Sequence, residues 1–74
     1  MLGAVLNEAK QKEVIVPNPY SFQIHENTLF VEMRPSVKVW VVQVYRKGDT
    51  NHVIIEAQVN PTNFEVDAFS SYSN

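Results

Sequence analysis

The chain has no cysteine and only two glycines, Gly3 and Gly48, among its 74 residues. The first absence excludes disulfide bonds, thiolate metal sites and a cysteine nucleophile. The second excludes the glycine-rich loops that hold phosphates and the Gly-x-Ser-x-Gly turn of many hydrolases. We therefore expect a protein that is not an enzyme and has no cofactor.

Charge of one sign is also scarce. Six lysines and arginines stand against eight acidic residues, for a net charge of −2, so no field for phosphate binding is expected. The apolar start, Met1 to Leu6, lacks a basic flank and is interrupted by Asn7 and Glu8. It is too short for a signal peptide or a spanning helix. A cytoplasmic protein without membrane contact is the expectation, and the absence of cysteine is compatible with it.

The length predicts one small domain over residues 1–74, with a frayed polar tail at 70–74. A chain of this size buries little apolar surface on folding, and association is a common reinforcement. A homodimer, or a complex with a larger partner protein, is therefore expected.

The first part of the chain has the apolar spacing of a helix. Leu2, Val5, Leu6 and Ala9 share one face of a helix over about 2–12. So short a helix is marginal alone in water, so it should pack on another element.

After the helix, apolar residues alternate with polar ones, which indicates strands. The segment from Tyr20 to Met33 predicts a hairpin that turns at Glu26 and Asn27, or through a four-residue loop from His25 to Thr28 that retains the same pairs. In this hairpin Ile24 would face Leu29, with Phe22 opposite Val31 and Tyr20 opposite Met33, so that every cross-strand pair on one face is apolar.

The run from Val37 to Tyr45 is the longest apolar segment and predicts a strand with two apolar faces. A strand over about 52–59 should pair with it. A two-residue turn would place Trp40 opposite Ala57, whereas a three-residue loop would place Val41 there. The choice decides which face of the long strand belongs to the core, and both registers remain open at this stage.

A last, more acidic strand around Phe64, Val66 and Ala68 suits a sheet edge. The predicted fold is α+β and dominated by strands. A short N-terminal helix packs on an antiparallel meander of four to five strands. A small open β-barrel is the alternative.

The second apolar face of the long strand is the leading candidate for a binding site. An apolar patch with a polar rim is typical of an interaction surface. The predicted anchors are Trp40, Val42, Val44 and Ile54, and the predicted rim includes Lys38 and Arg46. The chain would then be a protein-binding domain, acting as an accessory or regulatory subunit or as a homo-oligomer. In the opposing interpretation, the helix simply covers this face.

A second hypothesis is a small barrel that binds single-stranded nucleic acid. The bases of the nucleic acid would stack on Trp40 and Tyr45 beside the cations Lys38, Arg46 and Lys47. The acidic balance of the chain argues against it.

The two histidines are the remaining candidates for chemistry. His25 is followed by Glu26, and His52 lies three residues after Asp49. Imidazole with carboxylate can bind a metal or transfer a proton. Neither spacing matches an established metal motif, and both histidines lie next to expected turns, so no metal site is predicted.

Overall fold

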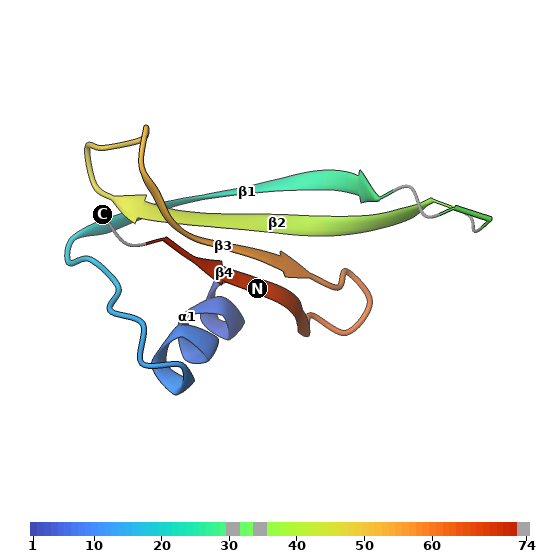
Figure 1. Ribbon diagram of the computed structural model, residues 1–74, viewed down its shortest axis with the longest axis horizontal. Coiled ribbons are helices and arrows are strands. Elements are labelled where there is room, and N and C mark those ends of the chain that lie inside the picture. The colour runs from blue at the N-terminus through green and yellow to red at the C-terminus, as the bar shows by residue number, and fades with distance from the viewer. Residues whose placement is uncertain (30–31, 34–35, 73–74) are drawn as a thin grey trace.

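In the part of the chain that the structure describes, the fold consists of one helix and one four-stranded sheet. The computed structural model describes residues 1–29, 32–33 and 36–72. Its elements are α1 (Leu2–Gln11), β1 (Tyr20–Leu29), β2 (Val37–Arg46), β3 (Val53–Val59) and β4 (Val66–Ser71). The strands are antiparallel and lie in the order β1-β2-β3-β4 (Figure 1). This confirms the α+β meander with an N-terminal helix, and the described strands form an open sheet rather than a closed barrel.

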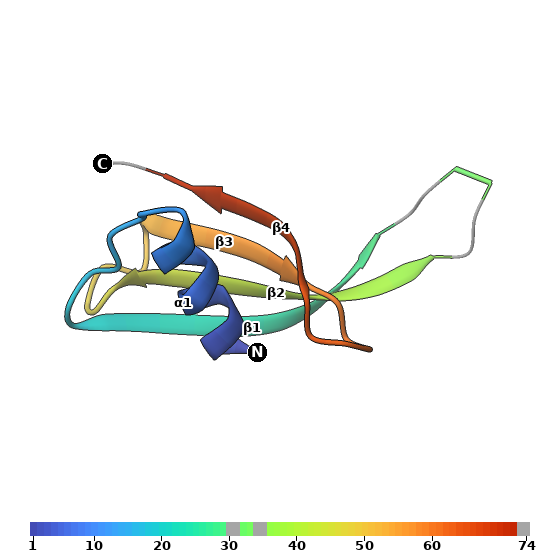
Figure 2. The same cartoon turned by 90° about the horizontal axis from the view of Figure 1, so that it is seen from below.

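The helix crosses one face of the sheet (Figure 2). It ends one residue before the predicted boundary. Val5 and Ala9, one turn apart, are its fully buried residues. The chain leaves the helix through Glu13, which has a φ of 59°. The Val14 N–H then donates to the Ala9 carbonyl at 2.8 Å, which closes the end of the helix.

The predicted hairpin is wrong, because the segment from Tyr20 to Leu29 is one continuous strand. Glu26 and Asn27 lie within it, opposite Trp40 and Val39 of β2. A two-residue hairpin turn requires positive φ at its central residues, which favours glycine and is costly at Glu26. Pairing with β2 instead extends along all of β1 without a register shift. The predicted partner Val31 lies outside the described residues.

The register between β2 and β3 matches neither predicted alternative. Val42 lies opposite Ala57 and Val44 opposite Ile55, and the register shifts after Val44. Ile54 is the additional residue of this bulge, a device that kinks a strand and strengthens its twist. The loop from Lys47 to His52 is longer than either predicted turn, and it contains Gly48 at a φ of 88°.

The core lies between α1 and the face of the sheet that carries Val42 and Val44. Side chains of the helix and of the two central strands, β2 and β3, meet there. Each central strand has a neighbouring strand on both sides, which helps to exclude water from its side chains. The fully buried cluster consists of Val5, Ala9, Val42, Val44, Ile55, Ala57 and Val59.

The opposite face of β2 is also apolar, yet it forms no broad apolar surface. Val39 and Val41 are buried there. Their cross-strand neighbours on β1 are the polar Asn27 and His25, and Gln58 of β3 lies on the other side of Val41. Polar residues on the flanking strands thus border a narrow apolar row.

Strand β4 begins at Val66, later than the predicted strand. Phe64 lies in the preceding turn, with a φ of 58° and an exposed side chain. Ser70 and Ser71, which we expected in a frayed tail, belong to β4. The Tyr72 N–H donates to the Ile54 carbonyl at 2.7 Å, so pairing continues to residue 72.

The described part of the chain contains no helix with the length and apolarity needed to cross a membrane.

Candidate functional site

The predicted interface anchors lie in and around the core. Val42 and Val44 are fully buried beneath α1. Trp40 and Ile54 are half-buried and pack against the same cluster. The helix covers this face, as the opposing interpretation held, because its buried residues Val5 and Ala9 pack there. This corrects the placement of the anchors: in the single chain the face is core, and Val42 and Val44 present no surface to a partner.

The two predicted rim residues are exposed at opposite ends of β2. The Lys38 Nζ lies 3.5 Å from Glu26 Oε1 on the neighbouring strand, with both side chains largely in solvent. Arg46 is exposed at the other end of β2. Exposed ion pairs stabilise a fold only slightly, so the main effect of the Lys38–Glu26 pair is that the two opposite charges offset each other.

The residues of the nucleic-acid hypothesis do not form one surface. An odd number of positions separates Trp40 from Tyr45 on β2, so their rings point to opposite faces of the sheet. Tyr45 is only 7% exposed. The cations Lys38, Arg46 and Lys47 lie at the two ends of the strand. This arrangement does not offer successive bases a shared stacking platform beside positive charge.

The histidines lie apart from one another. His25 is in the middle of β1, whereas His52 is in the loop before β3. The His52 Nδ1 lies 2.9 and 3.0 Å from the two carboxylate oxygens of Asp49. The hydrogen bond to His52 is the main reason that the pKa of Asp49 lies below its ordinary value. Among residues 1–29, 32–33 and 36–72, no three His, Asp or Glu side chains are arranged to hold a metal ion.

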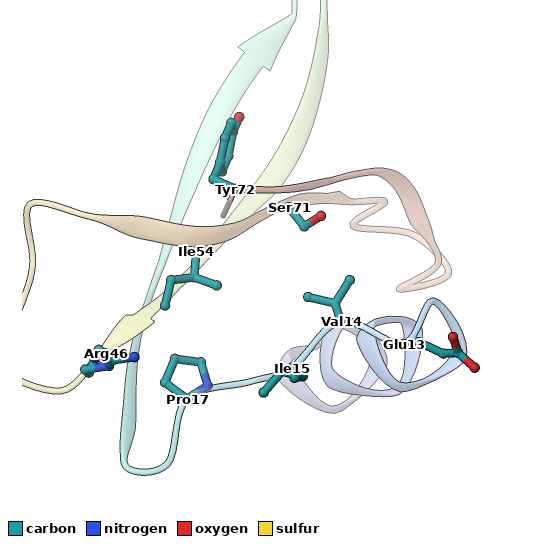
Figure 3. Close-up of a pocket in the computed structure, with 8 residues that line it drawn as sticks. All are labelled: Glu13, Val14, Ile15, Pro17, Arg46, Ile54, Ser71 and Tyr72. Carbon is teal, nitrogen blue, oxygen red and sulfur yellow. The ribbon is translucent and has the colours of Figure 1, made fainter. Parts of the chain in front are cut away.

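A hollow of about 420 Å³ opens beside the end of the helix (Figure 3). Val14, Pro17 and Ile54 surround it, and the Glu13 carboxylate is directed away from it. Arg46, Ser71 and Tyr72 add polar groups at its border. The hollow is wide open, and it lacks the enclosed, convergent polar groups that typify a catalytic or small-molecule site.

Strand β1 forms a free edge of the sheet. Among the described residues only β2 pairs with it, so half of its backbone groups point away from the sheet. The Lys47 N–H donates to the Pro19 carbonyl at 3.3 Å, in register with the strand pair. Because bonding alternates along an antiparallel pair, residues 21, 23, 25, 27 and 29 also bond to β2. The backbone groups of Tyr20, Phe22, Ile24 and Glu26 therefore point outward.

The same residues carry an apolar stripe on the helix side of the sheet. Tyr20, Phe22 and Ile24 share this face, with exposed fractions of 36%, 46% and 36%. We call the outward backbone of residues 20–26, together with these three side chains, the β1 edge. It combines unpaired hydrogen-bonding groups with exposed apolar side chains, which is the arrangement that accepts an added strand.

Sequence reasoning found the alternation of Tyr20, Phe22 and Ile24 but assigned it to the inside of a hairpin. Part of the signal for an edge was present in the sequence. Tyr20, Phe22 and Ile24 alternate with polar residues, and the polar run His25, Glu26 and Asn27 follows them. The position of a strand in the sheet order, however, is a property of the tertiary structure.

Comparison of the chain with protein-family models, with curated proteins and with solved structures finds no significant match to any of them.

Proposed function

We propose that this protein is a small non-enzymatic binding domain, an accessory or regulatory subunit, that takes up an extended protein segment along the β1 edge. The carrying observation is the juxtaposition of outward backbone groups with exposed Tyr20, Phe22 and Ile24 on a strand with a single neighbour. The proposal keeps protein binding as the expected function and moves the site from the covered face to the edge.

The backbone provides the affinity in this kind of recognition. An incoming strand exchanges N–H···O bonds with alternate residues of the edge, and side-chain contacts on each face select the sequence. On the helix side, the incoming segment would meet Phe22 and Ile24. On the other face it would meet the uncharged Ser21 and Gln23. The preferred ligand is therefore an extended segment with alternating apolar and polar residues.

Strand β1 itself carries little charge. From Tyr20 to Leu29 the strand carries one carboxylate, Glu26, and that group lies 3.5 Å from the Lys38 ammonium. A partner strand thus encounters little uncompensated charge, and desolvation of the edge costs less than it would beside isolated ions. Single-stranded nucleic acid finds less support here, because its phosphates need a cluster of cations.

Selection of peptides from a random library against the immobilised protein tests the proposal. We expect selected peptides to be extended and alternating, and to bind with an affinity that Ile24→Pro lowers at least about tenfold. Proline at residue 24 removes an outward N–H and leaves the β1–β2 bonds in place. Fluorescence anisotropy of labelled peptide measures the affinity, and circular dichroism verifies that the variant is folded.

Ile15→Ser is the matched control. Ile15 is 87% exposed and lies before β1, so this variant also removes an exposed isoleucine but leaves the edge intact. Its affinity for the peptides should equal that of the unaltered protein. The proposal is wrong if peptides bind Ile24→Pro as tightly as the unaltered protein, or if Ile15→Ser is the variant that loses binding.

A further inference from the structure

We infer that the segment bound by the β1 edge is the β1 strand of a second copy of this chain, paired antiparallel about a twofold axis at Gln23. The inference rests on the proposed function, and it names the partner and the register. In this dimer Phe22 lies opposite Ile24 of the second copy, and Tyr20 lies opposite Glu26.

The edge is self-complementary in its hydrogen bonds. The residues whose backbone groups point outward, Tyr20, Phe22, Ile24 and Glu26, all lie at even positions. A twofold axis through an odd position pairs even positions with even positions. Each such pair can exchange both of its N–H···O bonds. The Thr28 N–H already donates to Oδ1 of Asn27, the preceding residue of the same chain, at 3.0 Å. The self-pairing segment therefore ends near Glu26.

The register centred on Gln23 uses the edge better than its neighbours do. Moving the axis to Ile24 places Phe22 opposite the Glu26 carboxylate and requires the occupied Thr28 N–H. Moving it to Phe22 leaves Glu26 opposite Asn18, which lies before the strand begins. With the axis at Gln23, all residues from 20 to 26 are paired within β1.

Charges are complementary in the same register. Arg46 is the β2 partner of Tyr20, so Glu26 of the second copy lies one strand beyond Tyr20 on the same face. Two strand spacings separate the two charged residues, about 10 Å, which is comparable to the screening length at physiological salt. The attraction occurs twice by symmetry. No pair of like charges meets across the axis, although each chain has a net charge of −2.

The continuous sheet that results gives both copies an interior strand where each now has an edge. On the face away from the helices, Ser21 lies opposite His25 of the second copy, and the two Gln23 side chains meet at the axis. These are polar neighbours, which are compatible with a face exposed to water.

The position of Gln23 on the axis provides a direct test. Residue 23 forms a pair without hydrogen bonds across the interface, with Cα atoms about 4.5 Å apart. That separation lies within the disulfide range of about 4.4–6.8 Å. The chain has no cysteine of its own. Gln23→Cys should therefore become a covalent dimer when oxidised glutathione takes up the electrons of the two thiols.

Ser21→Cys is the matched control for the crosslink. It lies on the same strand and the same face, but in this register the two copies of residue 21 are displaced by about 13 Å along the strand. We expect nearly complete crosslinking at residue 23 and little at residue 21, as measured on a non-reducing gel at equal protein concentration. Equal crosslinking of both variants would indicate random collision and would overturn the inferred register.

Light scattering during size-exclusion chromatography tests the dimer without any crosslink. The unaltered chain should have about twice the 8.5 kDa mass of the monomer, and Ile24→Pro and Gln23→Lys should have the monomer mass. Gln23→Lys places two lysines opposite each other on the axis but leaves every backbone group of a single chain unchanged. A monomer at all concentrations up to the millimolar range would overturn the inference.

These outcomes separate the inference from the proposed function. If the protein is a monomer but selected peptides still bind and Ile24→Pro abolishes that binding, the edge accepts a strand from another protein and the second copy is excluded. If neither self-association nor peptide binding depends on residue 24, both the inference and the proposed function are wrong.

Discussion

The two edges of the sheet differ in almost every property that controls strand addition. β1 is ten residues long and pairs with β2 in an unbroken register, whereas β4 has six residues and a register shift next to Val59. β4 carries Asp67, and its chain neighbour Glu65 adds a second carboxylate. Short length, a bulge and charge are the features by which proteins protect an edge.

The helix increases the difference between the two edges. The Lys12 Nζ lies 5.7 Å from the centre of the Phe69 ring, so the end of α1 borders β4. Phe69 packs against the core, whereas Phe22 on β1 is 46% exposed. One edge is thus shielded and the other is presented to solvent. Because of this asymmetry we propose binding at β1 and not at β4.

The largest effect should come from a comparison of two isoleucines on the same face of the sheet. Ile55 is completely buried in β3, whereas Ile24 on β1 is 36% exposed. Ile55→Ala should lower the free energy of unfolding by about 3–4 kcal/mol, because it removes buried methyl groups and leaves a cavity. Ile24→Ala should cost below about 1 kcal/mol when measured at a concentration where the protein is monomeric. Urea denaturation measures both, and equal losses would contradict the assignment of β1 to the surface.

Proline substitutions along β1 should reveal the alternation of its backbone bonds. His25→Pro removes an N–H that bonds to β2 and leaves a carbonyl of β2 without its donor, at a cost of about 2–3 kcal/mol. Ile24→Pro removes an outward N–H and should cost clearly less. Thermal denaturation of the two variants checks the order. The reverse order would show that the outward and inward positions had been exchanged.

The shielding of β4 by the helix should have a smaller effect. Lys12→Ala removes the contact with Phe69 and the 3.4 Å ion pair with Glu8. We expect a loss of about 0.5–1 kcal/mol, since both interactions are partly exposed. Lys10→Ala, at another exposed helix lysine, is the matched control and should change stability less. Hydrogen exchange at Ser70, whose N–H is directed toward β3 by the alternation that the Tyr72–Ile54 bond sets, should accelerate in Lys12→Ala alone if the helix end protects this edge.

The smallest effect concerns the loop that joins the two central strands. The pKa of Asp49 is lowered by its hydrogen bond to His52, so the folded form binds the carboxyl proton more weakly than the unfolded form does. Its small contribution to stability is therefore complete above the ordinary pKa of 3.8 and is lost as pH falls through the lowered value. In His52→Ala, a carbon-detected NMR titration should show the pKa of Asp49 closer to 3.8. An unchanged titration would exclude His52 as the cause.

Much of the fold was predictable from local patterns. The spacing of Leu2, Val5 and Ala9 predicted the helix to within one residue, and β-branched residues predicted the strand from Val37. Both patterns are strong because apolar periodicity directly reports the face that a helix or strand buries. The hairpin at Glu26 failed because an alternating segment of ten residues has the same pattern whether it turns or continues.

The residues of the candidate site were not predicted from the sequence. An apolar surface of a strand was expected to bind protein, but the residues chosen, Val42 and Val44, lie under the helix. The pattern of β2 has two apolar faces, and nothing local indicates which of them α1 will cover. Trp40 and Tyr45 were both assigned to the nucleic-acid hypothesis, and β2 places their rings on opposite faces of the sheet.

By itself, the amino-acid sequence determined the kinds of element, their order and the exclusion of chemistry that needs cysteine or glycine-rich loops, because these follow from composition and short-range periodicity. The tertiary structure alone decided the register of β2 with β3, the face that became core, and the position of β1 at an edge. Those features depend on contacts between residues far apart in the chain, where one extra residue in a loop, such as that at the Ile54 bulge, changes which side chains meet.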